Sequence, residues 1–81
     1  MKTNKAKEIK IENGDIVLFK NDLIINKVYG KKLFLPNMKI YKNTFQKVTR
    51  VYDDGVFEIE LDPYFYNKFK FTIEMVENVV D

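Results

Sequence analysis

Carboxylates are the only side chains in this sequence whose type and spacing are suited to catalysis. Asp53 and Asp54 are adjacent, and Glu58 and Glu60 would share one face of a strand. Such pairs can hold a metal ion or exchange protons with a substrate. However, adjacent acids in a tight turn are ordinarily turn formers, and alternating Glu residues are ordinarily a solvated strand face. We therefore interpret both pairs as structural.

Other catalytic apparatus is excluded by composition. The sequence contains no His and no Cys. Ser-His and Cys-His nucleophile pairs therefore cannot form, nor can zinc sites or disulfides that need these residues. Three scattered glycines, at positions 14, 30 and 55, make no phosphate-binding loop. The sequence predicts a protein that is not an enzyme, with no cofactor and no metal.

An aromatic run is the most unusual feature. Five aromatic residues fall between positions 64 and 71, interleaved with two lysines. Exposed rings stack on bases while lysines neutralise phosphates, so the pattern suits single-stranded nucleic acid or nucleotides. Phe65, Phe69 and Phe71 are predicted to fill the core instead. Tyr64 and Tyr66, on one side of an extended segment, are candidate ligand-binding residues if they are exposed.

Three cations and one further tyrosine complete the candidate ligand-binding residues. Lys31 and Lys32 follow Tyr29 and a flexible Gly30, an arrangement that can clamp a phosphate or form a solvated loop. Arg50 can recognise phosphate or carboxylate in a bidentate manner. Its alternative is a pairing across a hairpin with Glu58 or Glu60.

Charge is divided unevenly along the chain. Residues 20–50 hold eight basic residues and one acid, whereas residues 51–81 hold eight acids and two lysines. This division indicates either a basic surface for an anionic partner or two neighbouring segments that neutralise each other. Residues 1–10 are polar and Lys-rich, which predicts a flexible basic lead-in rather than a signal peptide or anchor. With no long apolar run and no Cys, we expect a cytoplasmic protein without membrane contact.

Short strands must position these residues. A Gly14-Asp15 turn opens the apolar run 16–19, which predicts a strand buried on both faces. Residues 45–52 and 56–61 flank Asp53-Asp54-Gly55 and predict a hairpin, with a bulge where Val48 and Val51 break the alternation. Met38 is predicted to reach the core from a connecting turn, and Thr72 to cap a short C-terminal helical turn. Closure of these strands into a barrel would remove exposed edges.

The order of these features matches a family pattern. The matching residues are Gly14-Asp15, Val17, Met38, Val48, Val51, Asp53-Asp54-Gly55, Phe71-Thr72, Glu74-Met75 and Glu77. The pattern resembles a family of small SH3-like barrel proteins of phages and mobile elements in low-GC Gram-positive bacteria. Asn43 stands where the family usually has Gly, and Phe71 where it usually has Trp. The resemblance implies an all-β, SH3-like barrel of about five strands over residues 11–81, and it transfers no binding site.

These features together predict a non-catalytic binding protein of phage or mobile-element type. It would act by occupancy or sequestration of a host factor or an anionic signal, for example as an inhibitor of a bacterial defence system. The alternative is a nucleic-acid-binding SH3-like or OB-like module with a basic patch and exposed tyrosines. The partner is then a host protein or an anionic ligand, either a nucleotide or a nucleic acid. The small area of such a barrel favours a homo-oligomer whose protomers share a pocket.

Overall fold

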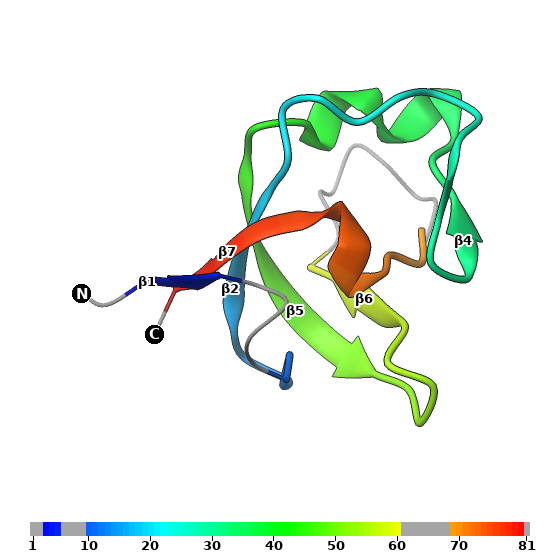
Figure 1. The fold of residues 1–81 in the computed structure, drawn as a ribbon. Coiled ribbons are helices and arrows are strands. Elements are labelled where there is room, and N and C mark those ends of the chain that lie inside the picture. Colours follow the sequence, from blue (N-terminus) through cyan, green and yellow to red (C-terminus); the bar gives the residue numbers. More distant parts are fainter. Residues whose placement is uncertain (1–2, 6–9, 61–68, 81) are drawn as a thin grey trace.

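The chain has an all-β fold, as predicted, built from two antiparallel sheets (Figure 1). A computed structural model describes residues 3–5, 10–60 and 69–80, with side chains for the last two ranges. The strands are β1 (Thr3–Lys5), β2 (Ile16–Phe19), β3 (Val28–Tyr29), β4 (Lys32–Leu33), β5 (Phe45–Val51), β6 (Phe57–Ile59) and β7 (Val76–Val80). Two 3₁₀ turns, η2 (Pro36–Tyr41) and η3 (Ile73–Met75), connect them. The predicted C-terminal helical turn is η3.

Strand β2 lies at the centre of the larger sheet, whose order is β1-β7-β2-β5-β6. Val17 pairs with Gln46 of β5 on one side and with Val79 of β7 on the other. On the edge of β6 that faces away from β5, Phe57 forms an isolated bridge with Phe71. The two residues exchange backbone hydrogen bonds of 2.9 and 2.8 Å. Among the described residues, no bridge joins the two ends of this row, so closure into a barrel stays a prediction.

The predicted hairpin is confirmed as β5 and β6. The register shifts between Val48 and Arg50, which is the predicted bulge. At the turn, Tyr52 N–H donates to Val56 C=O at 2.8 Å, and Asp54 Oδ1 accepts the Val56 N–H at 3.1 Å. Gly55 has φ of 86°, a left-handed conformation that suits glycine. Asp54 therefore acts as a turn former, as the sequence indicated.

The prediction that β2 is buried on both faces is wrong. Val17 and Phe19 are buried at 0 % and 1 % exposure, but Ile16 is 39 % exposed and Leu18 is half-buried. This alternation means that one face of the strand meets the core and the other lies at the surface. A short continuous apolar run does not distinguish these two cases by its sequence alone.

Aromatic rings from separate segments meet in the core. The Phe19 ring of β2 lies 4.7 Å from the Phe71 ring and 6.3 Å from the Phe57 ring, centroid to centroid. All three are fully buried. Phe69 is half-buried and packs against this cluster. The prediction that these rings fill the core is therefore confirmed for Phe71. Phe69 lies at the edge of the core, and Phe65 lies outside the described residues.

The long connection between β2 and β5 carries η2 and the smaller sheet. Met38 and Tyr41 of η2 are both buried, as the sequence indicated for Met38. Asn43 has φ of 57° just before β5, a left-handed conformation that Asn tolerates better than most residues. The connection thus contributes two core side chains and then turns sharply into the central hairpin.

The β3–β4 hairpin is anchored to the C-terminal segment through Tyr29. Thr72 immediately precedes η3, as predicted, but its hydroxyl makes no capping hydrogen bond. It donates instead to the Tyr29 C=O at 2.6 Å. The Tyr29 phenol oxygen accepts the Ile24 N–H at 2.8 Å. Tyr29 therefore holds both the hairpin and the connection that leads into it.

A strand also lies within the predicted basic lead-in. Thr3–Lys5 forms β1 and pairs antiparallel with β7, with Thr3 opposite Val80. Nothing in the composition of residues 3–5 indicates a strand, because its formation depends on pairing with a distant segment. The boundary of the domain at residue 11 stays a prediction.

Gly30 joins β3 to β4 with φ of 65°, which costs a residue with a side chain about 1–2 kcal/mol. A Cβ atom at this position would also collide with the carboxylate of Glu74. We expect Gly30→Ala to lower the free energy of unfolding by about 1–2 kcal/mol, measured by urea denaturation. Gly30→Asn should cost less, because Asn tolerates this conformation better.

A second substitution separates the two expected causes of destabilisation in Gly30→Ala, which are the backbone strain and the collision with Glu74. Glu74→Ala removes the collision but leaves the backbone strain. Because a Glu side chain can rotate away, we expect Gly30→Ala to cost nearly the same in the Glu74→Ala background. An Ala variant as stable as the original chain would contradict the assigned strain.

Candidate functional site

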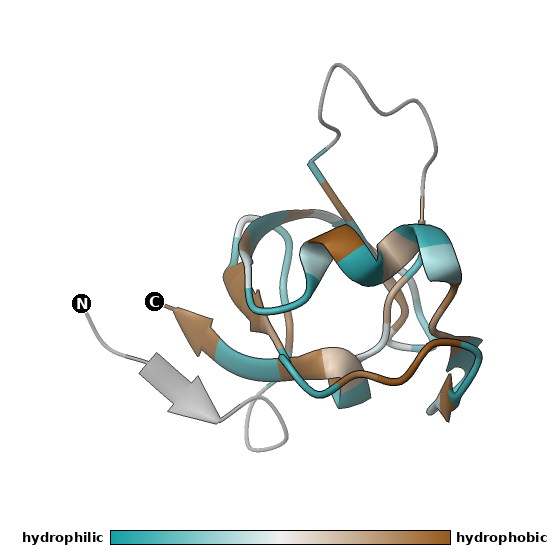
Figure 2. Ribbon diagram, turned by 90° about the horizontal axis from the view of Figure 1, so that it is seen from above, coloured by the Kyte–Doolittle hydropathy of each residue, from teal (hydrophilic) through white to brown (hydrophobic). Residues whose placement is uncertain are grey.

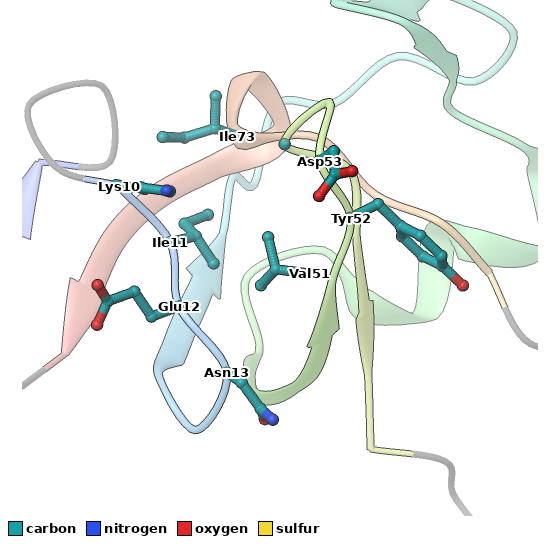
Figure 3. A pocket seen from close by; sticks show the side chains of 9 residues that line it. Lys10, Ile11, Glu12, Asn13, Val51, Tyr52, Asp53 and Ile73 are labelled. Atoms are coloured by element: carbon teal, nitrogen blue, oxygen red, sulfur yellow. The ribbon is translucent and has the colours of Figure 1, made fainter.

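Among the described residues, three shallow depressions surround the turn between β5 and β6. The largest, of about 460 Å³, is lined by Lys10, Ile11, Glu12, Asn13, Val51, Tyr52, Asp53, Gly55 and Ile73 (Figure 3). The second, of about 400 Å³, is lined by Lys32, Tyr52, Asp53, Asp54, Val56 and Lys70. A third, of about 100 Å³, separates this turn from Gly30 and Lys31. The turn is therefore the place where separate charged segments meet.

The largest depression has an apolar floor and charges of both signs at its rim. Ile11 and Val51 face each other there, and the Tyr52 ring points away from them (Figure 3). Lys10 is one cation against the two carboxylates of Glu12 and Asp53. This mixed rim selects no single ligand chemistry.

Cations gather around one ring at the second depression. The Arg50 guanidinium carbon and the Lys70 Nζ each lie 4.8 Å from the Tyr52 ring centroid. Lys32 and Lys70 line this depression with Asp53 and Asp54, whereas Arg50 is not part of its lining. Cations are attracted to the face of an aromatic ring by its quadrupole. We call Lys32, Arg50, Tyr52 and Lys70 the Tyr52 cluster.

Strand register explains why these groups meet. Arg50 of β5 lies opposite Glu58 of β6. On the other side of β6, the bridge between Phe57 and Phe71 places Lys70 beside the same Glu58. Because Phe57 and Phe71 point into the core, their sequence neighbours point outward. Glu58 is therefore flanked by a cation on each side.

Tyr52 is held by that same carboxylate. Its hydroxyl donates a short hydrogen bond to Glu58 Oε2. This hydrogen bond is the largest cause that raises the pKa of Tyr52 above its ordinary value of 10.0, and burial adds to it. The positive charge of Arg50 acts in the opposite direction. The hydrogen bond to Glu58 therefore fixes the position of the Tyr52 hydroxyl while both cations lie near its ring.

Carboxylates balance part of the positive charge. Asp54 is engaged by the Val56 N–H within the turn, and Glu58 by the Tyr52 hydroxyl. Asp53 is exposed and lines both of the larger depressions. An anion in this depression would therefore meet two carboxylates, Asp53 and Asp54, of which Asp54 accepts a hydrogen bond within the turn.

The structure brings together only part of the predicted ligand-binding set. Lys32 and Arg50 belong to the Tyr52 cluster, and Arg50 also lies opposite Glu58, as its alternative interpretation required. Lys31 lies in the third depression, and Tyr29 is an anchor of the hairpin. Tyr64 and Tyr66 lie outside the described residues.

Sequence reasoning missed Tyr52 and Lys70. A signal for Tyr52 was present, because residues two apart in a strand share a face and Tyr52 follows Arg50 at that spacing. No local signal was available for Lys70. Its position depends on the bridge between Phe57 and Phe71, which joins segments that are not adjacent along the chain.

Metal-binding clusters and membrane-spanning helices are both absent from the part of the chain that the structure describes. No group of three or more His, Cys, Asp or Glu side chains there is arranged to hold a metal ion. Within the same residues, no helix is long and apolar enough to cross a membrane.

Comparison of the chain with protein-family models, with curated proteins and with solved structures found no match. The resemblance to SH3-like proteins of phages and mobile elements therefore stays a prediction.

The hydrogen bond from Tyr52 to Glu58 predicts an unusual titration. We expect Tyr52 to titrate above 10.0, and Glu58→Gln to move its pKa back toward that value. A raised pKa in the folded state stabilises the fold at pH below 10.0, and this contribution is lost as the pH rises through the raised value. Carbon-13 NMR of the tyrosine Cζ atoms measures this directly. Titration of Tyr52 at or below its ordinary pKa would contradict the assigned bond.

Proposed function

We propose that this protein is a non-catalytic binding protein that engages a phosphate-bearing partner at the Tyr52 cluster. The observation that carries the proposal is the approach of Arg50 and Lys70 to one ring, each at 4.8 Å, beside Lys32. Arg and Lys side chains donate strong charge-assisted hydrogen bonds to phosphate. The protein then acts by occupancy or sequestration of its partner.

A nucleotide fits the cluster better than a nucleic acid strand. Proteins bind single strands by stacking bases on exposed aromatic faces. A base that stacks on a covered face of Tyr52 must first displace Arg50 or Lys70. The depression of about 400 Å³ is within the size range of small-molecule sites. A nucleotide is therefore the first candidate ligand.

Single-stranded nucleic acid is the second candidate. The excess of eight basic residues over one acid in residues 20–50 favours it, because such a surface attracts a polyanion. The resemblance to proteins of phages and mobile elements adds a cellular location to the proposal. The protein would act in the cytoplasm of a bacterial host, on a host factor or an anionic signal.

Loss of one cation from the cluster tests the proposal. ATP and a short fluorescent oligothymidylate are the two probes, measured by calorimetry and by anisotropy at low salt. We expect Lys70→Ala to weaken binding roughly tenfold, the loss of one hydrogen bond to a charged group. Lys39→Ala removes the same charge from η2, outside the cluster, and should change the affinity little.

The two probes separate the candidates. A nucleic-acid partner requires an affinity for the oligonucleotide that falls steeply with salt, whereas a nucleotide partner requires saturable ATP binding. Absence of binding to both probes, or equal losses in Lys70→Ala and Lys39→Ala, would overturn the proposed site.

Removal of the exposed carboxylate should have the opposite effect. Asp53 repels an anion at the Tyr52 cluster, so Asp53→Asn should strengthen binding of the anionic probe roughly two- to fivefold. Glu77→Gln on β7 neutralises another exposed carboxylate and is the matched control. The same titration measures both variants. A weaker affinity in Asp53→Asn would show that Asp53 contacts the ligand favourably or supports the turn.

A further inference from the structure

The hairpin that carries Lys32 belongs to a sheet of its own. β3 and β4 pair with each other, whereas the five other described strands form the larger sheet. Both ribbon views place this hairpin on the side of the molecule remote from the two termini (Figures 1 and 2). Lys70, in contrast, lies next to Phe71, whose bridge to Phe57 attaches it to the edge of the larger sheet. The spacing of the two lysines that line the second depression therefore depends on how the two sheets are joined.

Thr72 joins the two sheets through a buried hydroxyl. It is 5 % exposed, and every other buried residue in the described part of the chain is apolar or aromatic. Its hydroxyl donates to the Tyr29 C=O at 2.6 Å, across 43 positions of the chain. Tyr29 is the register partner of Lys32 in the hairpin. The hydrogen bond therefore holds the strand that pairs with Lys32.

This hydroxyl is not used for the turn that follows it. Thr72 precedes η3 but makes no capping hydrogen bond there. A buried hydroxyl is costly unless it is hydrogen-bonded, so the bond to Tyr29 accounts for a polar side chain in an apolar core. Packing of the buried Phe34 also holds the hairpin, but apolar contact is non-directional, whereas a hydrogen bond fixes a distance and an angle. Thr72 therefore sets where the hairpin lies on the core.

We propose that Thr72 is a positioning residue for the phosphate site at the Tyr52 cluster. Its bond to Tyr29 holds the hairpin where Lys32 lines the same depression as Lys70. Thr72 itself lines the third depression rather than the second, so it acts through Lys32 and not on the ligand. This inference rests on the proposed function. It adds that a phosphate-bearing ligand engages Lys32 and Lys70 together and so bridges the two sheets.

Removal of the hydroxyl tests the positioning role, in the same ATP and oligothymidylate titrations. Thr72→Val retains a similar shape, and we expect it to weaken binding roughly two- to tenfold, because a displaced Lys32 loses part of a hydrogen bond to a charged group. Thr72→Ser retains the hydroxyl and should bind like the original chain. Thr44→Val is the matched control, since the Thr44 hydroxyl also donates to a backbone carbonyl, that of Tyr41, just before β5. It should change the affinity little.

A double-mutant cycle separates positioning from a general loss of structure. If Thr72 acts through Lys32, Thr72→Val has little further effect in the Lys32→Ala background but keeps its effect in the Lys70→Ala background. Equal losses in both backgrounds would overturn the positioning role. Unchanged affinity in Thr72→Val or in Lys32→Ala would also overturn it, but would leave the proposed site intact if Lys70→Ala still weakens binding. Absence of binding of both probes to the original chain would overturn both proposals.

Amide hydrogen exchange provides a test that needs no ligand. The Phe34 N–H donates to the Lys27 C=O at 2.9 Å at the base of the hairpin, and the Val48 N–H donates to the Asp15 C=O at 2.7 Å beside the larger sheet. We expect Thr72→Val to speed exchange of the Phe34 amide several-fold more than that of the Val48 amide, because the hairpin opens locally. Equal acceleration of both amides would show a global loss of stability and contradict the assigned role.

Discussion

The paired hydrogen bonds between Phe57 and Phe71 are the constraint on which the rest of the structure depends. They attach the segment that leads into η3 and β7 to the outer edge of β6. They also set two buried rings 5.9 Å apart, in contact with Phe19 of the central strand. Since buried backbone groups must be paired, this bridge satisfies hydrogen bonding and core packing together. The bridge therefore also fixes the backbone positions of Glu58 and Lys70, whose side chains point outward.

Glu58 is the clearest consequence of that constraint. Its position between Phe57 and Ile59, both buried, directs its side chain outward, with Arg50 on one neighbouring strand. The bridge adds Lys70 on the other side. This carboxylate accepts the Tyr52 hydroxyl and keeps its negative charge. The same arrangement brings the Arg50 guanidinium carbon and the Lys70 Nζ to 4.8 Å each from the Tyr52 ring centroid.

Features set by local chemistry were predictable from the sequence, and features set by distant pairing were not. The hairpin and its bulge follow from Asp53-Asp54-Gly55 and from the spacing of Val48 and Val51, all within one short segment. By contrast, β1 forms only through β7, and Lys70 joins the candidate site only through a bridge to β6. Charge counts had the same limit. They identified a basic segment but not which lysines share a face.

Two members of the Tyr52 cluster, Lys70 and Lys32, are positioned by the same short stretch of chain, Phe71 and Thr72. Lys70 directly precedes Phe71, whose backbone is bonded to β6. Lys32 belongs to a hairpin that Thr72 holds by donating to the Tyr29 C=O at 2.6 Å. Phe71 and Thr72 therefore fix the segments that carry Lys70 and Lys32, which line one depression. Because both residues are buried, a ligand would meet cations whose backbone positions are set before it binds, which reduces the entropy lost on association.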